Sequence, residues 1–361
     1  MKIAFLNVYN GLVNRGAETF VKELAVRLSK NHQVVVFQAG DKQKKETYKI
    51  HKIFVKLDPK KKEFADFFLR RAFLDYQNRV IFLFTIKALP QISKDKYDIV
   101  IPVNGGFMPA ILRVATWLYG GKMIISGQSG IGWDDINNLF CFPDIFVVLS
   151  KKAKKWAKKI NPFVKVIKIT NGVDIKKFQV PKNRLKKKAS KTILAVGAFV
   201  KSKRLELAIE AVSRLENVNL IIAGGGGPLK DKINQLGLEK LGKKRFKILS
   251  VSYEKMPQIY HMADALTLPS VPNEAFGNVL VEAMACGLPV VATNDEIRKE
   301  IVGKAGILID PTDIDSYANA LNMALNKNWD KIPRNTAVKF SWDIVTHKYE
   351  NLFKSLRKEK L

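Results

Sequence analysis

Residues 269–293 read PSVPNEAFGNVLVEAMACGLPVVAT, and this stretch is the most informative part of the chain. It predicts a loop that carries Glu274, a helix that follows Gly277 and contains Glu282, and a strand that opens at Pro289. The start of a helix presents N–H groups that bind phosphate, and a glycine there lets a ligand approach the backbone closely. We therefore interpret the stretch as a phosphate cradle with a carboxylate on each side, suited to a diphosphate that links a sugar to a nucleoside.

Strand-like and helix-like segments alternate on both sides of this stretch, which predicts an α/β fold with parallel sheets covered by helices on both faces. Before it, apolar runs predict strands at residues 2–8, 33–38, 98–103, 123–126 and 145–149. After residue 191, strands are predicted from Thr192, within NLIIA, at 265–270 and at 289–293. A last helical segment carries Trp342, Val345, Tyr349 and Phe353 on one face.

A polar and basic segment at 181–191, PKNRLKKKASK, interrupts the alternation and predicts a linker or an exposed edge. The chain has 361 residues, more than one core usually holds. We therefore expect two doubly wound, Rossmann-like domains that face each other across a cleft, spanning 1–172 and 173–340. Ligands of such sheets bind at the carboxyl ends of the strands.

Composition narrows the class of protein. Its 47% of apolar residues suffices for globular cores, and its two cysteines, Cys141 and Cys286, provide no disulfide framework and favour a reducing, cytoplasmic location. The N-terminal MKIAFLNVYNG predicts a buried strand rather than a signal peptide. The apolar run at 80–86 is far shorter than the roughly 20 residues of a membrane span.

The formal net charge of +29 attracts anionic partners, although a lysine-rich proteome explains the total equally well. Two basic segments with interleaved apolar residues, 151–168 and 60–92, fit either ordinary domain helices or a face that contacts an anionic membrane. Peripheral association with the inner face of the cell membrane therefore stays open. Nucleic acid is not expected as a partner, because no recognition motif accompanies the charge.

Several motifs, taken together, resemble those of the family 4 retaining glycosyltransferases. Glu274 and Glu282 match the E-x7-E signature of that family. Further similar segments follow in the same order and spacing, namely RGAE at 15–18, TNGVD at 170–174, AGGGGPL at 223–229, Met262-Ala263-Asp264 and Leu268-Pro269-Ser270.

This resemblance implies a GT-B fold, with the nucleotide-sugar donor bound mainly by the second domain and the acceptor mainly by the first. It implies that the helix at 341–361 packs back on the first domain, and that no metal or other cofactor is required. The implied reaction moves a hexosyl group from a nucleotide diphosphate sugar to a hydroxyl of a sugar, lipid-linked or polysaccharide acceptor, with retention. Cell-surface polysaccharide or glycolipid synthesis is the expected context.

The same resemblance assigns roles to residues of the second domain. Glu274 is expected to hold hydroxyls of the transferred sugar, and Lys203 to bind the diphosphate as leaving-group charge develops. The family's arginine after the glycine is Ala198 here, which leaves the adjacent Arg204 as a substitute cation. The expected donor-binding set is Glu282 (for the ribose), Phe276, Gly277, Asn278, Gly197, Arg204, Gly225, Gly226 and, from the first domain, Gly16.

Acceptor-side candidates lie in the first domain: Asn10, Arg15, Ser126, Gln128 and Ser129. Relatives place a histidine near Gln128, and this chain has none there. The pair Asp134-Asp135 is interpreted as a helix N-cap with a first-turn acid in preference to a metal site.

Alternatives remain for each motif and for the whole chain. Lys203 fits a solvated lysine at a helix start, and Gly224–Gly227 fits a plain turn. A nucleotide-sugar epimerase or phosphorylase on a related fold would keep the donor chemistry, but its own acid–base groups are not evident. A non-catalytic basic protein that binds polyanions is the alternative outside enzymes.

Overall fold

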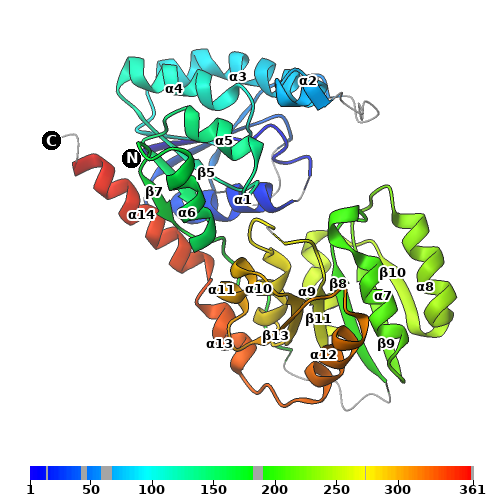
Figure 1. The fold of residues 1–361 in the computed structure, drawn as a ribbon. Helices are drawn as coiled ribbons and strands as arrows, with labels where there is room; N and C mark the ends of the chain where they lie inside the picture. Colours follow the sequence, from blue (N-terminus) through cyan, green and yellow to red (C-terminus); the bar gives the residue numbers. More distant parts are fainter. Residues whose placement is uncertain (14, 42–46, 58–66, 182–189, 273, 359–361) are drawn as a thin grey trace. The chain divides into compact units, whose positions relative to one another are not determined.

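The structure is a computed structural model that describes residues 1–13, 15–41, 47–57, 67–181, 190–272 and 274–358. Most of the predicted linker at 181–191, and residues 60–66 of the predicted basic segment, lie outside the described residues. The chain divides into two compact units (Figure 1): Met1–Asn171 with Asp343–Leu361 is unit 1, and Gly172–Trp342 is unit 2. Each unit is built on one parallel sheet, so the two predicted Rossmann-like folds are confirmed.

The sheet of unit 1 has seven strands, and all of its neighbouring pairs are parallel. Their spatial order is β3 (Lys49–Lys52), β2 (Gln33–Gln38), β1 (Lys2–Leu6), β4 (Ile99–Pro102), β5 (Lys122–Ser126), β6 (Ile145–Val148) and β7 (Val166–Lys168). In the register of the central strands, Ile3 of β1 pairs with Val34 of β2 and with Ile99 of β4.

Helices cover both faces of this sheet because alternate side chains of each strand point to opposite faces. Ala4 and Leu6 of β1 join a core with α3 (Tyr76–Asp95) and α4 (Met108–Tyr119), which lie side by side along one face (Figure 1). Phe5 instead contacts Phe20 of α1 (Gly16–Leu28), and Phe20 contacts Tyr349 of α14 (Trp342–Lys358). The remaining helices of unit 1 are α2 (Phe67–Arg71), α5 (Trp133–Phe140) and α6 (Lys151–Ile160).

Unit 2 repeats this topology with six strands, again all parallel. Their order is β10 (Phe246–Leu249), β9 (Val218–Ala223), β8 (Lys191–Val196), β11 (Ala265–Leu268), β12 (Val290–Thr293) and β13 (Gly306–Ile309). The helical segments are η1 (Lys201–Lys203), α7 (Leu205–Ser213), α8 (Lys230–Arg245), η2 (Tyr253–Lys255), α9 (Met256–His261), α10 (Asn278–Ala285), α11 (Glu296–Val302), α12 (Ile314–Asn326) and α13 (Ile332–Val338).

The strand order reverses at the centre of each sheet, between β1 and β4 in unit 1 and between β8 and β11 in unit 2. In sheets with such a reversal, ligands bind beyond the carboxyl ends of the two central strands. The loops after β8 and β11 carry Lys203 and Glu274, and the loop after β5 carries Gln128 and Ser129. The topology therefore places the predicted site residues of each unit at its binding edge.

The apolar stripe of α6 faces the core of unit 1. Ala157 is fully buried, and Ala153, Trp156 and Ile160 pack against the same cluster. The stripe therefore serves the fold rather than a membrane surface, and the lysines of α6 surround it. Within the described ranges, we find no helix with the length and apolar character of a membrane span.

Gly237 offers a test of the packing in unit 2. It lies inside α8, and a Cβ there would meet the ring of Phe246 at 2.2 Å. Alanine normally stabilises a helix relative to glycine by about 1 kcal/mol. We expect Gly237→Ala instead to destabilise the protein by about 1–3 kcal/mol in urea denaturation, because the ring cannot shift freely. In the double variant with Phe246→Leu the two costs should be less than additive, and strict additivity would contradict this contact.

Candidate functional site

The ends of the two central strands of unit 2 bring Lys203 and Glu274 together. Lys203 ends η1 in the loop after β8, and Glu274 lies in the loop after β11. Lys203 Nζ forms an ion pair with Glu274 Oε1, and each side chain is about one-quarter exposed. The two residues are 71 positions apart, so this pair exists only because β8 and β11 are neighbours in the sheet.

The second carboxylate oxygen of Glu274 has its own donors. Ser270 Oγ donates to Glu274 Oε2 at 2.6 Å, and Arg298 Nη2 lies 3.2 Å from the same oxygen. Burial alone would raise the pKa of Glu274, but the Lys203 ammonium, the hydrogen bonds and the Arg298 charge together lower it below its usual value. Glu274 is therefore held as a carboxylate, with Lys203 on one oxygen and a fixed network on the other.

Arg298 is a site residue that sequence reasoning missed. Its side chain is 2% exposed, it pairs with Asp295 at the start of α11, and its Nη2 donates to Ser270 Oγ at 2.6 Å. A buried guanidinium requires such partners, because an unpaired buried charge is very costly. The spacing Asp295-x-x-Arg298 directly after β12 was the available signal, since a cation one turn into a helix is unfavourable without an acid beside it.

The residues predicted to form a ligand cradle at the start of α10 also have structural roles. Gly277 has φ +84°, and a Cβ there would press on Leu280 at 3.2 Å, so its backbone angle and the core explain the glycine. Phe276 is buried against Phe340 with ring centroids 5.8 Å apart, which leaves only its backbone for a ligand. Asn278 is the first residue of α10 and is half-buried.

Glu282 lies inside α10 and is 8% exposed. Tyr260 Oη donates to Glu282 Oε2 at 2.7 Å, and Tyr260 is fully buried. Burial, followed by the charge and hydrogen bond of Glu282, raises the pKa of Tyr260. The tyrosine therefore holds one oxygen of the carboxylate that was predicted to bind the ribose.

Gly197 and Arg204 flank Lys203, and their roles differ. A Cβ at Gly197 would lie 3.3 Å from the Lys203 stem, so the glycine lets that side chain cross the backbone. Arg204 was predicted to replace the cation missing at Ala198. Instead its Nε donates to the Pro269 carbonyl at 2.7 Å and its Nη2 to the Ser270 carbonyl at 3.0 Å. The Arg204 guanidinium thus binds carbonyls of the loop after β11. This argues against the predicted contact between Arg204 and a phosphate.

The glycines after β9 divide into two kinds. A Cβ at Gly224 would meet the Gly197 carbonyl oxygen at 2.1 Å, and one at Gly227 the Phe199 carbonyl oxygen at 2.5 Å, so packing within unit 2 requires both. Gly225 and Gly226 would meet no described atom within 4 Å. These two, which were the predicted donor-contacting glycines, therefore face open space at the binding edge.

The predicted residues near the start of α1 differ in exposure. Asn10 is 4% exposed, and its Nδ2 donates to Gln38 Oε1. Arg15 caps α1, pairs with Glu18 and lies 5.1 Å from the centroid of the Tyr9 ring. Gly16 is the exposed first residue of α1.

Gln128 and Ser126 form a polar group at the end of β5. The amides of Gln128 and Asn171 exchange two hydrogen bonds of 2.9 and 3.0 Å, and Gln128 Nε2 also donates to Ser126 Oγ at 2.9 Å. Tyr349 Oη of α14 donates to the same Ser126 hydroxyl at 3.3 Å. These contacts make Ser126 and Gln128 an internal network, whereas Ser129 is exposed.

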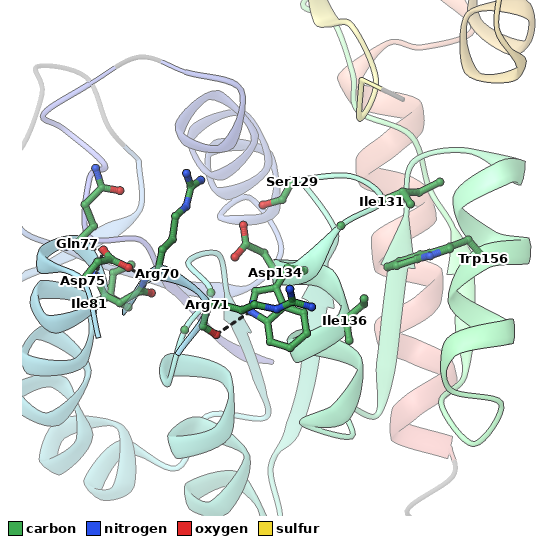
Figure 2. Close-up of a pocket in the computed structure, with 15 residues that line it drawn as sticks. Arg70, Arg71, Asp75, Gln77, Ile81, Ser129, Ile131, Asp134, Ile136 and Trp156 are labelled. Atoms are coloured by element: carbon green, nitrogen blue, oxygen red, sulfur yellow. Dashed lines mark hydrogen bonds between the residues drawn. The ribbon is translucent and has the colours of Figure 1, made fainter. Parts of the chain in front are cut away.

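Ser129 lines a cavity of about 670 Å³ that lies wholly within unit 1 (Figure 2). Other lining residues come from α2, α3, α5 and α6, among them Arg70, Arg71, Trp133, Asp134 and Trp156. The volume falls in the range of small-molecule sites, and the lining combines aromatic surface with a few charged groups. Of the predicted acceptor-side residues, only Ser129 lies in it.

Asp134 and Asp135 lie in the first turn of α5, and the N-cap is Gly132 rather than either acid. Asp134 is exposed to the cavity, whereas Asp135 is 3% exposed and accepts a hydrogen bond from Asn138. Across the residues the structure describes, no group of three or more His, Cys, Asp or Glu side chains could hold a metal ion. The two acids therefore belong to the helix start and the cavity.

Comparison with known proteins identifies the larger part of unit 2. Residues 176–339 match the model of the family described as glycosyl transferases group 1. This segment is similar to group 1 glycosyl transferases. The segment contains Lys203, Glu274, Glu282 and Arg298, so both the pair at the centre of the sheet and its buried support lie inside it.

Curated relatives match part of the chain. O-antigen chain mannosyltransferase B of Escherichia coli is 36% identical over 108 residues, which cover 28% of each protein. D-inositol 3-phosphate glycosyltransferase of Corynebacterium urealyticum is 30% identical over 220 residues, covering 52% of this chain and 50% of the relative. The chain thus spans half or less of the length of these relatives.

Solved structures resemble the whole chain. Sucrose-phosphate synthase from Thermosynechococcus elongatus has a TM-score of 0.80 at 18% identity and covers 99% of each chain. Anabaena Alr3699/HepE in complex with UDP-glucose has a TM-score of 0.77 at 17% identity, covering 98% of this chain and 100% of that one. Identities this low show the fold alone, and they confirm the predicted GT-B class.

Asp135 makes stability depend on pH. Burial, opposed by the Asn138 hydrogen bond, raises the pKa of Asp135 to about 7. The unfolded carboxyl has a pKa of about 4, so the folded protein binds the extra proton between these values and loses stability as pH rises through them. We expect Asp135→Asn to gain stability relative to the parent protein between about pH 5 and pH 8, on the order of 3 kcal/mol.

Thermal or urea unfolding at several pH values measures this difference. Asp134→Asn is the matched control, because it makes the same chemical change on an exposed neighbour. Stability curves of Asp135→Asn and the parent protein that run parallel over the whole range would show that Asp135 is ionised in the folded state.

Proposed function

We propose that the chain is a retaining glycosyltransferase that moves a hexosyl group from a nucleotide diphosphate sugar to a hydroxyl acceptor. The observation that carries this proposal is the Lys203–Glu274 pair at the carboxyl edge of β8 and β11, inside the segment that is similar to group 1 glycosyl transferases. It is supported by structures of similar fold that bind UDP and UDP-glucose, and by a partial relative that is a mannosyltransferase.

The proposed donor site uses the pair as an exchangeable contact. Without donor, the Lys203 ammonium is neutralised by Glu274. A diphosphate carries more charge and takes Lys203 as its partner, which frees Glu274 Oε1 to accept hydrogen bonds from hydroxyls of the sugar. Ser270 and Arg298 keep Oε2 fixed during this exchange, so Glu274 stays ionised and in place.

In the transfer step, the bond between the anomeric carbon and the diphosphate oxygen breaks as the acceptor oxygen bonds to the same face of that carbon. The acceptor proton passes to the departing phosphate. Charge develops on the diphosphate, where Lys203 and the N-terminal end of α10 stabilise it. This cationic environment performs the task that a metal performs in other transferases, and we propose that no metal or other cofactor is needed.

The nucleoside of the donor would lie along the same carboxyl edge of the sheet of unit 2. Glu282, positioned by Tyr260, is proposed to accept the ribose hydroxyls, while Gly225 and Gly226 allow close approach from the β9 side. The acceptor is proposed to be a sugar, lipid-linked or polysaccharide hydroxyl used in cell-surface polysaccharide or glycolipid synthesis. We propose a cytoplasmic location with peripheral contact to an anionic membrane, in keeping with the net charge of +29.

Lys203 gives the most direct test. We expect Lys203→Ala to lower kcat/KM for donor turnover by about 100-fold or more, because one charged contact to the leaving group is lost. Lys201→Ala is the matched control, since Lys201 is exposed in the same short helix and should leave turnover unchanged. Equal turnover by the Lys203 variant and the parent protein would refute the assigned role.

Glu274→Gln separates sugar positioning from nucleotide binding. The amide keeps the shape but cannot neutralise Lys203, so we expect UDP, GDP or ADP to raise the unfolding temperature at least as much as in the parent protein. Transfer should fall by about 100-fold because hydroxyl contacts to a carboxylate are lost. A panel of these nucleotides and their sugars also names the donor, and no stabilisation by any of them would contradict a nucleotide-sugar enzyme.

A further inference from the structure

The cavity of unit 1 is lined by both cationic and hydrogen-bond-accepting side chains. Arg70 and Arg71 come from the last turn of α2, whereas Ser129 and Asp134 come from the loop after β5 and the start of α5. Figure 2 shows Arg70 extending between Gln77 on one side and Asp134 on the other. A ligand in this cavity thus meets two arginines together with the hydrogen-bond acceptors Ser129 and Asp134.

The two arginines are not equivalent. Arg71 is tied to the cavity wall: its guanidinium lies 4.7 Å from the centroid of Trp133, and Trp133 Nε1 donates to the Arg71 carbonyl at 3.0 Å. The Arg70 guanidinium, among the residues that the structure describes, makes no hydrogen bond or ion pair. Asp75 does not neutralise it, because its carboxylate caps α3 and accepts from Gln77 and Asn78. Arg70 is therefore available to an anionic ligand.

Aromatic contacts connect the cavity to the surface. Trp133 in the cavity wall stacks on Phe73, with ring centroids 6.4 Å apart. The ring centroid of Phe107 lies 6.3 Å from that of Phe73 and 6.1 Å from that of Phe82 of α3. Phe73 holds a left-handed backbone, with φ +57°, although it is not glycine. Such strain persists only where the surroundings impose it, so the position of Phe73 between the cavity and the surface is well determined.

The outer end of this aromatic series is exposed. Phe82 is 40% exposed and Phe107 is 39% exposed, and Leu74 beside Phe73 is 45% exposed. An apolar surface of this kind that adjoins a charged cavity favours a ligand with an apolar part.

We propose that this cavity binds an acceptor in which a phosphate group joins a sugar to an apolar chain. The phosphate binds Arg70 and Arg71, and the sugar hydroxyls donate to Asp134 and Ser129 inside the cavity. The apolar chain lies over Phe107, Phe82 and Leu74. The inference rests on the proposed glycosyl transfer and specifies its acceptor, because a charged head and an apolar tail together engage both the cavity and the exposed apolar surface beside it.

Three simple probes separate the parts of such a ligand: decyl phosphate, inorganic phosphate, and decyl maltoside below its micelle concentration. Binding to the full chain is followed by calorimetry. We expect decyl phosphate to bind at least about tenfold more tightly than either other probe, because only it offers both contacts. If inorganic phosphate bound as tightly as decyl phosphate, the proposed contact with an apolar chain would be wrong. If decyl maltoside bound as tightly, the proposed contact with a phosphate group would be wrong.

Variants locate the binding. Arg70→Gln should lower the affinity for decyl phosphate by about tenfold. Phe82→Ser should lower the affinity for decyl phosphate and leave the affinity for inorganic phosphate unchanged. Lys94→Gln is the matched control, since it removes the same charge from the exposed far end of α3, roughly 25 Å along the helix from Gln77. Equal weakening by Arg70→Gln and Lys94→Gln would overturn the site in favour of general attraction by the net charge.

Nucleotide binding in the same preparations distinguishes this inference from the proposed function. Thermal stabilisation by UDP, or by whichever nucleotide the panel identifies, should be the same in the Arg70, Phe82 and Lys94 variants. Loss of selective decyl phosphate binding with intact nucleotide binding overturns the acceptor site alone. Selective decyl phosphate binding without any nucleotide binding overturns the proposed transferase and leaves the cavity as an amphiphile site.

Discussion

The carboxylate of Glu274 is the feature on which the candidate site of unit 2 depends. Its burial opposes ionisation, and it stays charged because donors from three separate elements converge on it: Lys203, Ser270 and Arg298. Arg298 is itself buried and relies on Asp295. The site therefore has one exchangeable partner, Lys203, on a support that cannot move without leaving a buried charge unpaired. A ligand can displace the lysine while the network behind the carboxylate stays in place.

Both units follow one topological rule. Each sheet reverses its strand order at the centre, and the loops beyond the central strands carry the groups that are suited to ligands. In unit 2 this edge holds a cation and a carboxylate, with open glycines beside them. In unit 1 it borders a cavity whose lining includes two arginines, an acid and a hydroxyl. We have proposed the first of these edges as the site of a diphosphate sugar and the second as the site of an anionic acceptor.

Strand prediction from the sequence succeeded in the interior of the sheets and failed at their edges. The interior strands, such as β1, β4, β8 and β11, are fully or nearly fully buried runs of apolar residues. The edge strands β3, β7, β10 and β13 were not predicted. They are short and only partly buried, and KIHK of β3 shows why: with one side unpaired, charged residues are tolerated there. The same local reasoning assigned Phe276 and Arg204 to the donor, although the fold uses their side chains for packing and for loop carbonyls.

The sequence by itself determined the alternation of strands and helices, the two Rossmann-like folds, and the loops in which Lys203 and Glu274 lie, because these follow from periodic burial and from the conformational limits of single residues. Only the tertiary structure decided which residues meet. The 71-position separation of Lys203 and Glu274, the buried Arg298, the Tyr260–Glu282 hydrogen bond and the aromatic series from Trp133 to Phe82 leave no local pattern. Such contacts depend on how sheets and helices pack, and packing brings together segments that the order of residues along the chain keeps far apart.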